Sequence, residues 1–161
     1  KALIECGYAV SEKALRKGLL ETQWPGRFTV IGKRPLFVVD GAHNEDAAQK
    51  LADSIEIYFT NKRIIYIMGM LRDKEYEKVI ALTEKYADQI ITITPDNPRA
   101  LRAYDLAREI ARIHPNVTAV DSLEEAVEAS FLLAAKDDVI LAFGSLSYLG
   151  KLIKIVEQRV K

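Results

Sequence analysis

The chain has 161 residues, of which 49% are hydrophobic and 29% charged, and its 23 basic residues balance its 23 acidic ones. This composition is typical of one soluble globular domain, with or without an appendage, that can bury a core. A net charge of zero gives no electrostatic basis for binding nucleic acid or an anionic membrane, and no apolar run approaches the roughly 20 residues that span a bilayer. We therefore expect neither partner.

The ends of the chain and its cysteine content bear on where the protein works. Cys6 is the single cysteine, which excludes an intramolecular disulfide and fits a reducing compartment, so we predict a cytoplasmic protein. The sequence starts at Lys1 rather than Met and shows no signal peptide. We expect it to be a fragment or a processed form of a longer protein.

The first third of the chain predicts two helices followed by two strands. Residues 1–7 are typical of a helix end, and Ser11 is a suitable N-cap for a helix through Thr22. The triplet Trp24-Pro25-Gly26 then interrupts regular structure. A short strand is expected over 28–31, a turn over 32–34, and a strand buried on both faces over the apolar run 36–39.

Strands and helices alternate through the rest of the chain. The expected strands cover 63–68, 90–94, 117–120 and 139–143, and the expected helices cover 45–59, 73–87, 99–114, 122–135 and 146–160. Asp73 is the expected N-cap of the second of these helices, and Ser122 with Glu125 forms a capping-box pattern. This alternation predicts the α/β class, as a three-layer Rossmann-like domain with a mostly parallel sheet of about six strands.

The expected strands end at Asp40, Gly69, Thr94 and Gly144, and a polar or glycine-containing turn follows each. The carboxyl ends of parallel strands meet at one edge of a sheet, so a cleft is predicted there. Every Rossmann-like fold places a cleft at this edge. The pattern therefore locates a site without identifying its ligand.

The segment Asp40-Gly41-Ala42-His43-Asn44 is the first candidate for that site. Asp40, His43 and Asn44 supply a carboxylate, an imidazole and an amide within five residues at the start of a helix. These groups can bind a ribose hydroxyl, an ammonium group or a phosphate. The alternative is structural: Asn44 caps the helix, Gly41 turns the chain and His43 is a solvated loop residue.

Two further segments offer polar groups but no complete nucleotide motif. Arg27 follows a Pro-Gly turn, and it is either a phosphate-binding guanidinium or an ordinary surface arginine. Ser145 and Ser147 either cap the last helix or bind an anion at its N-terminus. The sequence contains no phosphate loop, no Gly-x-Gly-x-x-Gly and no zinc-type cluster. We therefore do not expect this chain alone to hold ATP in either usual way.

Taken together, five motifs carry a resemblance that covers nearly the whole chain. They are Trp24-Pro25-Gly26-Arg27-Phe28, Asp40-Gly41-Ala42-His43-Asn44, Gly69 followed by Asp73-Lys74, Asn97-Pro98-Arg99-Ala100, and Gly144-Ser145-Leu146. In this order and spacing the sequence resembles the C-terminal domain of folylpolyglutamate synthase/dihydrofolate synthase, in the Mur ligase superfamily. The first motif and Gly41 favour the folate branch, because peptidoglycan Mur ligases more often have a bulkier residue at the second position.

The resemblance implies a division of the chain and a set of site residues. Residues 1–23 would be the tail of a preceding N-terminal domain with the interdomain hinge, and 24–161 the C-terminal domain. Arg27 would contact the phosphates of ATP, and Asp40 its nucleoside. His43 and Ser145 would be the catalytic residues on the side where glutamate binds. Asn44 and Ser147 are further glutamate-binding candidates, with Ser147 an alternative to Ser145. No metal ligand is expected here, because Mg²⁺ would be held mainly by the N-terminal domain.

The implied reaction is ATP-dependent amide formation. A pteroate or folate carboxylate takes the γ-phosphoryl group, and the amine of L-glutamate then displaces phosphate from the acyl phosphate. The expected partners are these substrates and the protein's own N-terminal ATPase domain, in a monomer, and the isolated chain is expected to be inactive. Two alternatives stay open: the equivalent domain of a peptidoglycan Mur ligase, and a non-catalytic α/β module that binds a small anion.

Overall fold

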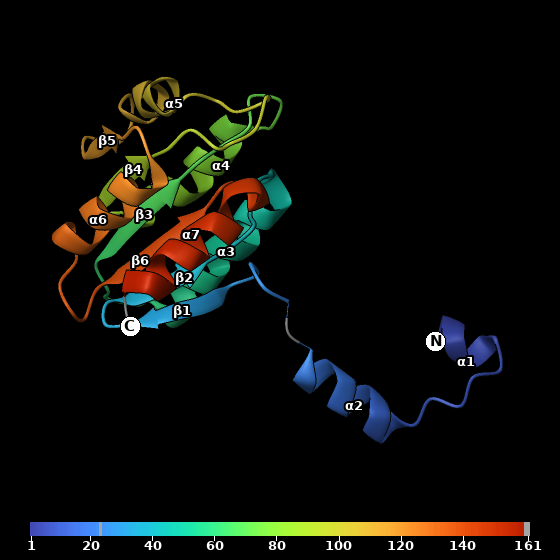
Figure 1. The fold of residues 1–161 in the computed structure, drawn as a ribbon. Coiled ribbons are helices and arrows are strands. Elements are labelled where there is room, and N and C mark those ends of the chain that lie inside the picture. Colours follow the sequence, from blue (N-terminus) through green and yellow to red (C-terminus); the bar gives the residue numbers. More distant parts are fainter. Residues whose placement is uncertain (23, 160–161) are drawn as a thin grey trace.

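A computed structural model describes residues 1–22 and 24–159 of the chain, and its central feature is a six-stranded sheet (Figure 1). The strand order is β1-β2-β6-β3-β4-β5, in which β1 runs antiparallel to β2 and all other neighbours are parallel. The strands are β1 (Thr29–Lys33), β2 (Leu36–Val39), β3 (Ile64–Met68), β4 (Gln89–Thr92), β5 (Val117–Ala119) and β6 (Val139–Phe143). The predicted mostly parallel sheet is confirmed.

Helices cover both faces of this sheet. They are α3 (Glu45–Tyr58), α4 (Tyr76–Thr83) with the short 3₁₀ helix η1 (Glu84–Tyr86), α5 (Ala103–Ile110), α6 (Leu123–Leu133) and α7 (Leu146–Arg159). One core cluster packs α3, α4 and α5 against one face, and a second packs α6 and α7 against the other. Side chains alternate between the clusters along β2, β3, β4 and β6, as Val38 and Val39 do in β2. The three-layer prediction is confirmed.

Helix N-caps agree with the sequence at three of the predicted positions. The side chains of Ser11, Asn44 and Ser122 each accept a hydrogen bond from the backbone N–H three residues later, at 3.0–3.1 Å. Such a bond satisfies one of the amides that the first turn of a helix leaves without a partner. The last helix was predicted to reach residue 160, which lies outside the described residues.

Two helix starts and one turn differ from the prediction. Helix α5 begins at Ala103 instead of residue 99, because 99–102 run beside residues 71–72 and form a bridge between Leu71 and Ala100. Helix α4 begins at Tyr76, since the predicted cap Asp73 pairs with an arginine of that neighbouring segment. The turn predicted over 32–34 lies at 34–35, because Gly32 continues β1 and pairs with β2.

The N-terminal segment forms α1 (Ala2–Glu5) and α2 (Glu12–Glu21), which Figure 1 shows apart from the sheet. Neither helix contains a buried residue. Leu15, Leu19 and Leu20 form the apolar side of α2, and they are 54–86% exposed. Among the described residues, no helix is both long enough and apolar enough to cross a membrane.

Candidate functional site

The loops that follow β2, β3, β4 and β6 come together at the carboxyl edge of the sheet, as predicted. Glycines allow their close approach. A Cβ atom at Gly41 would lie 2.6 Å from Cδ2 of Leu146, and one at Gly26 would lie 3.3 Å from the same atom. Gly144, with φ of +114°, brings its Cα so near the β3 loop that a Cβ would lie 2.5 Å from the carbonyl oxygen of Gly69.

These loops enclose a cavity of about 250 Å³, which we call the His43 cavity. It is lined by His43, Leu71, Lys74, Asn97, Arg99, Ser145, Leu146 and Ser147. Each of the four loops contributes at least one side chain. The structure therefore brings together His43, Ser145 and Ser147, three of the four polar residues that were predicted to bind glutamate.

Hydrogen bonds fix the orientation of these three side chains. Nδ1 of His43 lies 2.8 Å from the carbonyl oxygen of Gly41. A carbonyl only accepts, so Nδ1 carries the hydrogen and Nε2 of the neutral ring is the free acceptor. The hydroxyls of Ser145 and Ser147 lie 2.9 Å apart, and the N–H of Ser147 donates to Oγ of Ser145 at 3.3 Å. Ser145 thus accepts a hydrogen bond from the first turn of α7 and also lines the cavity.

Lys74 and Arg99 add positive charge that the sequence analysis did not assign to the site. A nitrogen of the Arg99 guanidinium donates to Asp73 at 2.7 Å, and the backbone N–H of Arg99 donates to the side chain of Asn97 at 2.9 Å. Lys74 has no ion pair with the residues that the structure describes. The two cations and Asp73 leave the cavity with one excess positive charge. Their positions in the loops that follow β3 and β4 were the signal that could have identified them.

Arg27 and Asp40 line a second, smaller cavity of about 190 Å³, which we call the Arg27 cavity. Its other lining residues are Phe28, Ala47, Lys50, Leu51 and Ser54. Lys50 and Ser54 are one turn apart on α3, and sequence reasoning missed both. The two cations, one hydroxyl and one carboxylate suit a ligand with phosphate and hydroxyl groups.

The carboxylate of Asp40 also binds the backbone on both sides of this cavity. One oxygen accepts a hydrogen bond from the N–H of Phe28 and the other from the N–H of Ala42, both at 2.8 Å. Arg27 and Asp40 thus line one cavity, and their contacts with ATP stay a prediction. Asn44, by contrast, lines neither of the two cavities, and its side chain caps α3. The predicted cap is confirmed, and glutamate binding by Asn44 stays a prediction.

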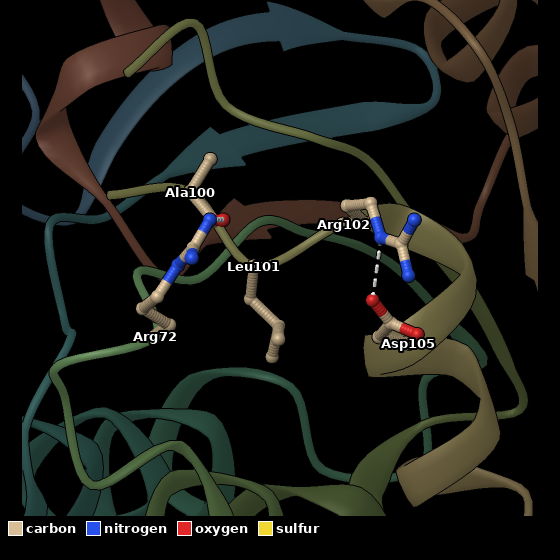
Figure 2. Close-up of a pocket in the computed structure, with 5 residues that line it drawn as sticks. All are labelled: Arg72, Ala100, Leu101, Arg102 and Asp105. Atoms are coloured by element: carbon tan, nitrogen blue, oxygen red, sulfur yellow. Dashed lines mark hydrogen bonds and ion pairs between the residues drawn. The ribbon is translucent and has the colours of Figure 1, made fainter. Parts of the chain in front are cut away.

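A third cavity, of about 450 Å³, lies at the start of α5 and was not predicted (Figure 2). It is lined by Arg72, Ala100, Leu101, Arg102 and Asp105. The guanidinium of Arg72 donates to the carbonyl of Ala100 at 3.1 Å, and Nε of Arg102 donates to Asp105 at 2.7 Å. The bond from Arg102 lowers the pKa of Asp105 below its ordinary value of 3.8. Both arginines therefore already have partners within the protein.

Comparison with known proteins identifies the family. The model of the Mur ligase, glutamate ligase domain matches residues 26–146, which is more than half of the chain. The chain belongs to this family. The dihydrofolate synthase/folylpolyglutamate synthase of Bacillus subtilis is 33% identical over 147 residues, a match that covers 90% of this chain and 33% of that protein.

Solved structures agree over almost the full length of the chain. Escherichia coli FolC in complex with DHPP and ADP matches 99% of this chain and 38% of its own, with a TM-score of 0.89 and 28% identity. A bifunctional folylpolyglutamate synthase/dihydrofolate synthase with Mn, AMPPNP and L-glutamate bound matches 94% of this chain and 36% of its own, with a TM-score of 0.83 and 26% identity. The chain thus spans about a third of the length of the relatives it matches.

Proposed function

We propose that this glutamate ligase domain is the C-terminal domain of a dihydrofolate synthase/folylpolyglutamate synthase, an ATP-dependent ligase that adds L-glutamate to dihydropteroate or folate. The observation that carries the proposal is the His43 cavity, where an imidazole, two hydroxyls and two cations from four separate loops surround about 250 Å³. The relatives named above support the folate branch over the peptidoglycan branch and over a non-catalytic anion-binding module.

In this proposal the His43 cavity receives L-glutamate. The substrate carries two carboxylates, which need cationic partners, and Lys74 and Arg99 supply them. The free Nε2 of His43 accepts a proton from the ammonium group, so that the amine becomes a nucleophile. Either Ser145 or Ser147 donates a hydroxyl hydrogen bond to a glutamate carboxylate, since the two hydroxyls lie side by side.

The Arg27 cavity is the proposed nucleotide contact. Arg27 would bind the phosphates of ATP and Asp40 the nucleoside, as the resemblance implies, with Lys50 and Ser54 as additional phosphate and hydroxyl partners. Solved relatives with ADP or AMPPNP support a nucleotide in this enzyme class. No group of three His, Cys, Asp or Glu side chains within 1–22 and 24–159 comes together as a metal site. As the resemblance implies, the divalent metal that accompanies ATP would be held mainly by the N-terminal domain.

The N-terminal segment is the proposed connection to that domain. We assign residues 1–23 to the tail of the N-terminal domain and the hinge, and 24–161 to the C-terminal domain. The exposed Leu15, Leu19 and Leu20 of α2 support this assignment, because an apolar helix side is stabilised by a covering partner. Closure of the two domains would exclude water from the acyl phosphate and bring Arg27 to the phosphates. We expect a cytoplasmic monomer.

The test is a steady-state assay of a full-length protein that carries this domain. ADP release that depends on L-glutamate and on dihydropteroate or folate is the expected result. Replacing Lys74 by Met should raise KM for glutamate by about 10- to 100-fold, as expected for one lost charged hydrogen bond, with a smaller effect on KM for ATP. Lys154→Met, at an exposed position of α7 outside the cavities described above, is the matched control.

Each alternative predicts a different result in the same assay. Activity with a peptidoglycan precursor and not with a pteroate or folate would assign the domain to the Mur branch. Absence of nucleotide turnover with any of these acceptors would leave only the binding module. The 161-residue chain alone should fold and show no ligase activity, because it spans a third of the relatives' length.

A further inference from the structure

Asp40 is hydrogen-bonded to the backbone next to a residue of each proposed site. Its carboxylate accepts the N–H of Phe28, in the loop that carries Arg27, and the N–H of Ala42, in the turn that leads to His43. We infer that Asp40 is a positioning residue, whose carboxylate ties these two loops together and thereby sets Arg27 for the nucleotide phosphates. This inference rests on the proposed nucleotide site, and it replaces a direct bond from Asp40 to a ribose hydroxyl by hydrogen bonds that position Arg27.

The loop that Asp40 holds has an unfavourable backbone conformation. Phe28 has φ of +41°, in the left-handed region that side chains other than glycine rarely adopt, and Gly26 has φ of +81°. Arg27 therefore lies between two left-handed residues. A segment of this kind keeps its shape only where its surroundings determine it. The hydrogen bond from Phe28 to Asp40 is one such constraint, and without it the backbone beside Arg27 loses its link to the end of β2.

Other contacts also hold this loop, among them a hydrogen bond from Oγ1 of Thr29, in β1, to the carbonyl of Arg27 at 3.2 Å. The backbone N–H of Arg27 donates to the carbonyl of Trp24 at 3.2 Å, which closes the turn but does not attach it to the sheet. The ring of Phe28 packs against Tyr58 and Phe59, with centroids 5.6 Å away in both cases. These aromatic contacts fix the side chain of Phe28. Asp40 supplies the polar link between the loop backbone and the end of β2.

The chemistry of the link requires a carboxylate. Two N–H donors converge on two different oxygens, so an amide of the same shape can accept only one of these bonds and turns a donor toward the other N–H. The Ala42 bond connects the same side chain to the turn where the carbonyl of Gly41 orients His43. Asp40→Asn should therefore break one of the two bonds, and with it the link between the Arg27 loop and the His43 turn, with little change in the volume of the side chain.

Kinetics of the full-length enzyme separate positioning from direct contact with the ribose. We would compare Asp40→Asn, Arg27→Ala and the double variant with ATP, 2′-deoxy-ATP and 3′-deoxy-ATP. Positioning predicts that Asp40→Asn lowers kcat/KM for all three nucleotides by the same factor, about 10- to 100-fold for a lost charged hydrogen bond. It also predicts little further loss when Arg27 is already absent. Asp46→Asn, on the exposed first turn of α3, is the matched control and should change neither.

Two kinetic results would overturn the inference. An Asp40→Asn effect that disappears with one of the deoxynucleotides would show that Asp40 acts through a ribose hydroxyl. Full additivity of the Asp40→Asn and Arg27→Ala effects would show that the two residues act independently. If Asp40→Asn does not fold, as judged by circular dichroism, Asp40→Glu is the second variant. Asp40→Glu keeps the charge but displaces the carboxylate oxygens by one methylene group. We expect kcat/KM to fall by the same factor for all three nucleotides, with little further loss when Arg27 is absent.

A measurement on the 161-residue chain tests the link without any ligase assay. Asp40→Asn should accelerate amide hydrogen exchange at Phe28 or Ala42 at least tenfold, and broaden or shift the Nε–H resonance of Arg27 in ¹⁵N NMR spectra. Asp46→Asn should leave all three signals unchanged. Unchanged protection and an unchanged Arg27 signal in Asp40→Asn would refute the positioning role. If the full-length protein proves inactive with every acceptor, the proposed function fails, whereas these NMR signals still decide the role of Asp40.

Discussion

Gly144 provides a sharp test of how the carboxyl edge is assembled. It directly follows β6, and its φ of +114° lies outside the conformations that residues with a side chain readily adopt. A Cβ atom there would lie 2.5 Å from the carbonyl oxygen of Gly69 and 2.7 Å from the sulfur of Met70. The first of these atoms belongs to the backbone at the end of β3, so it cannot rotate away as the end of a side chain can.

The expected cost of Gly144→Ala has two parts. The backbone conformation costs about 1–2 kcal/mol for a residue that carries a Cβ. Inserting a methyl group into a filled space costs about 1–3 kcal/mol in addition. We therefore expect the free energy of unfolding to fall by about 2–5 kcal/mol, which is a large part of the 5–15 kcal/mol typical of a domain.

Urea unfolding measures this change. We would follow it by circular dichroism and not by fluorescence, because Trp24 is 71% exposed and its fluorescence reports little of the core. Gly150→Ala is the matched control: it lies inside α7, and a Cβ there meets nothing within 4 Å. The control should be stabilised by about 0.5–1 kcal/mol through its better helix propensity. If Gly144→Ala were as stable as Gly150→Ala, the proposed close packing of the β3 and β6 loops would be wrong.

Further predictions concern a helix cap and two buried tyrosines. Asn44→Ala should destabilise the chain by about 1 kcal/mol in the same urea experiment, because an amide of α3 loses its acceptor. Equal stability would contradict the capping role. Burial raises the pKa of both Tyr66 and Tyr148 above the ordinary 10.0. Only the unfolded chain then loses these protons near pH 10. Stability should be complete below that pH and fall above it, by about 1.4 kcal/mol per pH unit for each tyrosine. Tyr148→Phe should reduce the loss of stability above pH 10 by about 1.4 kcal/mol per pH unit. An unchanged loss would show that burial does not raise the pKa of Tyr148.

Local sequence determined the elements whose formation depends on neighbours in the chain. The apolar runs at 36–39, 64–68 and 139–143 became strands buried on both faces, because only such strands tolerate continuous hydrophobic side chains. Ser11, Asn44 and Ser122 marked helix starts, because a cap needs only a side chain and an amide three residues away. The position of the cleft followed from the parallel sheet.

The tertiary structure decided what depends on residues far apart in sequence. Strand β6 lies between β2 and β3, so that the loop with Ser145 joins the loop with His43, about a hundred positions earlier. Contact with residues 71–72, and not helix propensity, keeps 99–102 out of α5 and places Arg99 beside Lys74. The link from Asp40 to Phe28 likewise depends on how β1 pairs with β2. Hydrophobic periodicity contains no information on such contacts, because it records which face of an element is buried and not which element covers it.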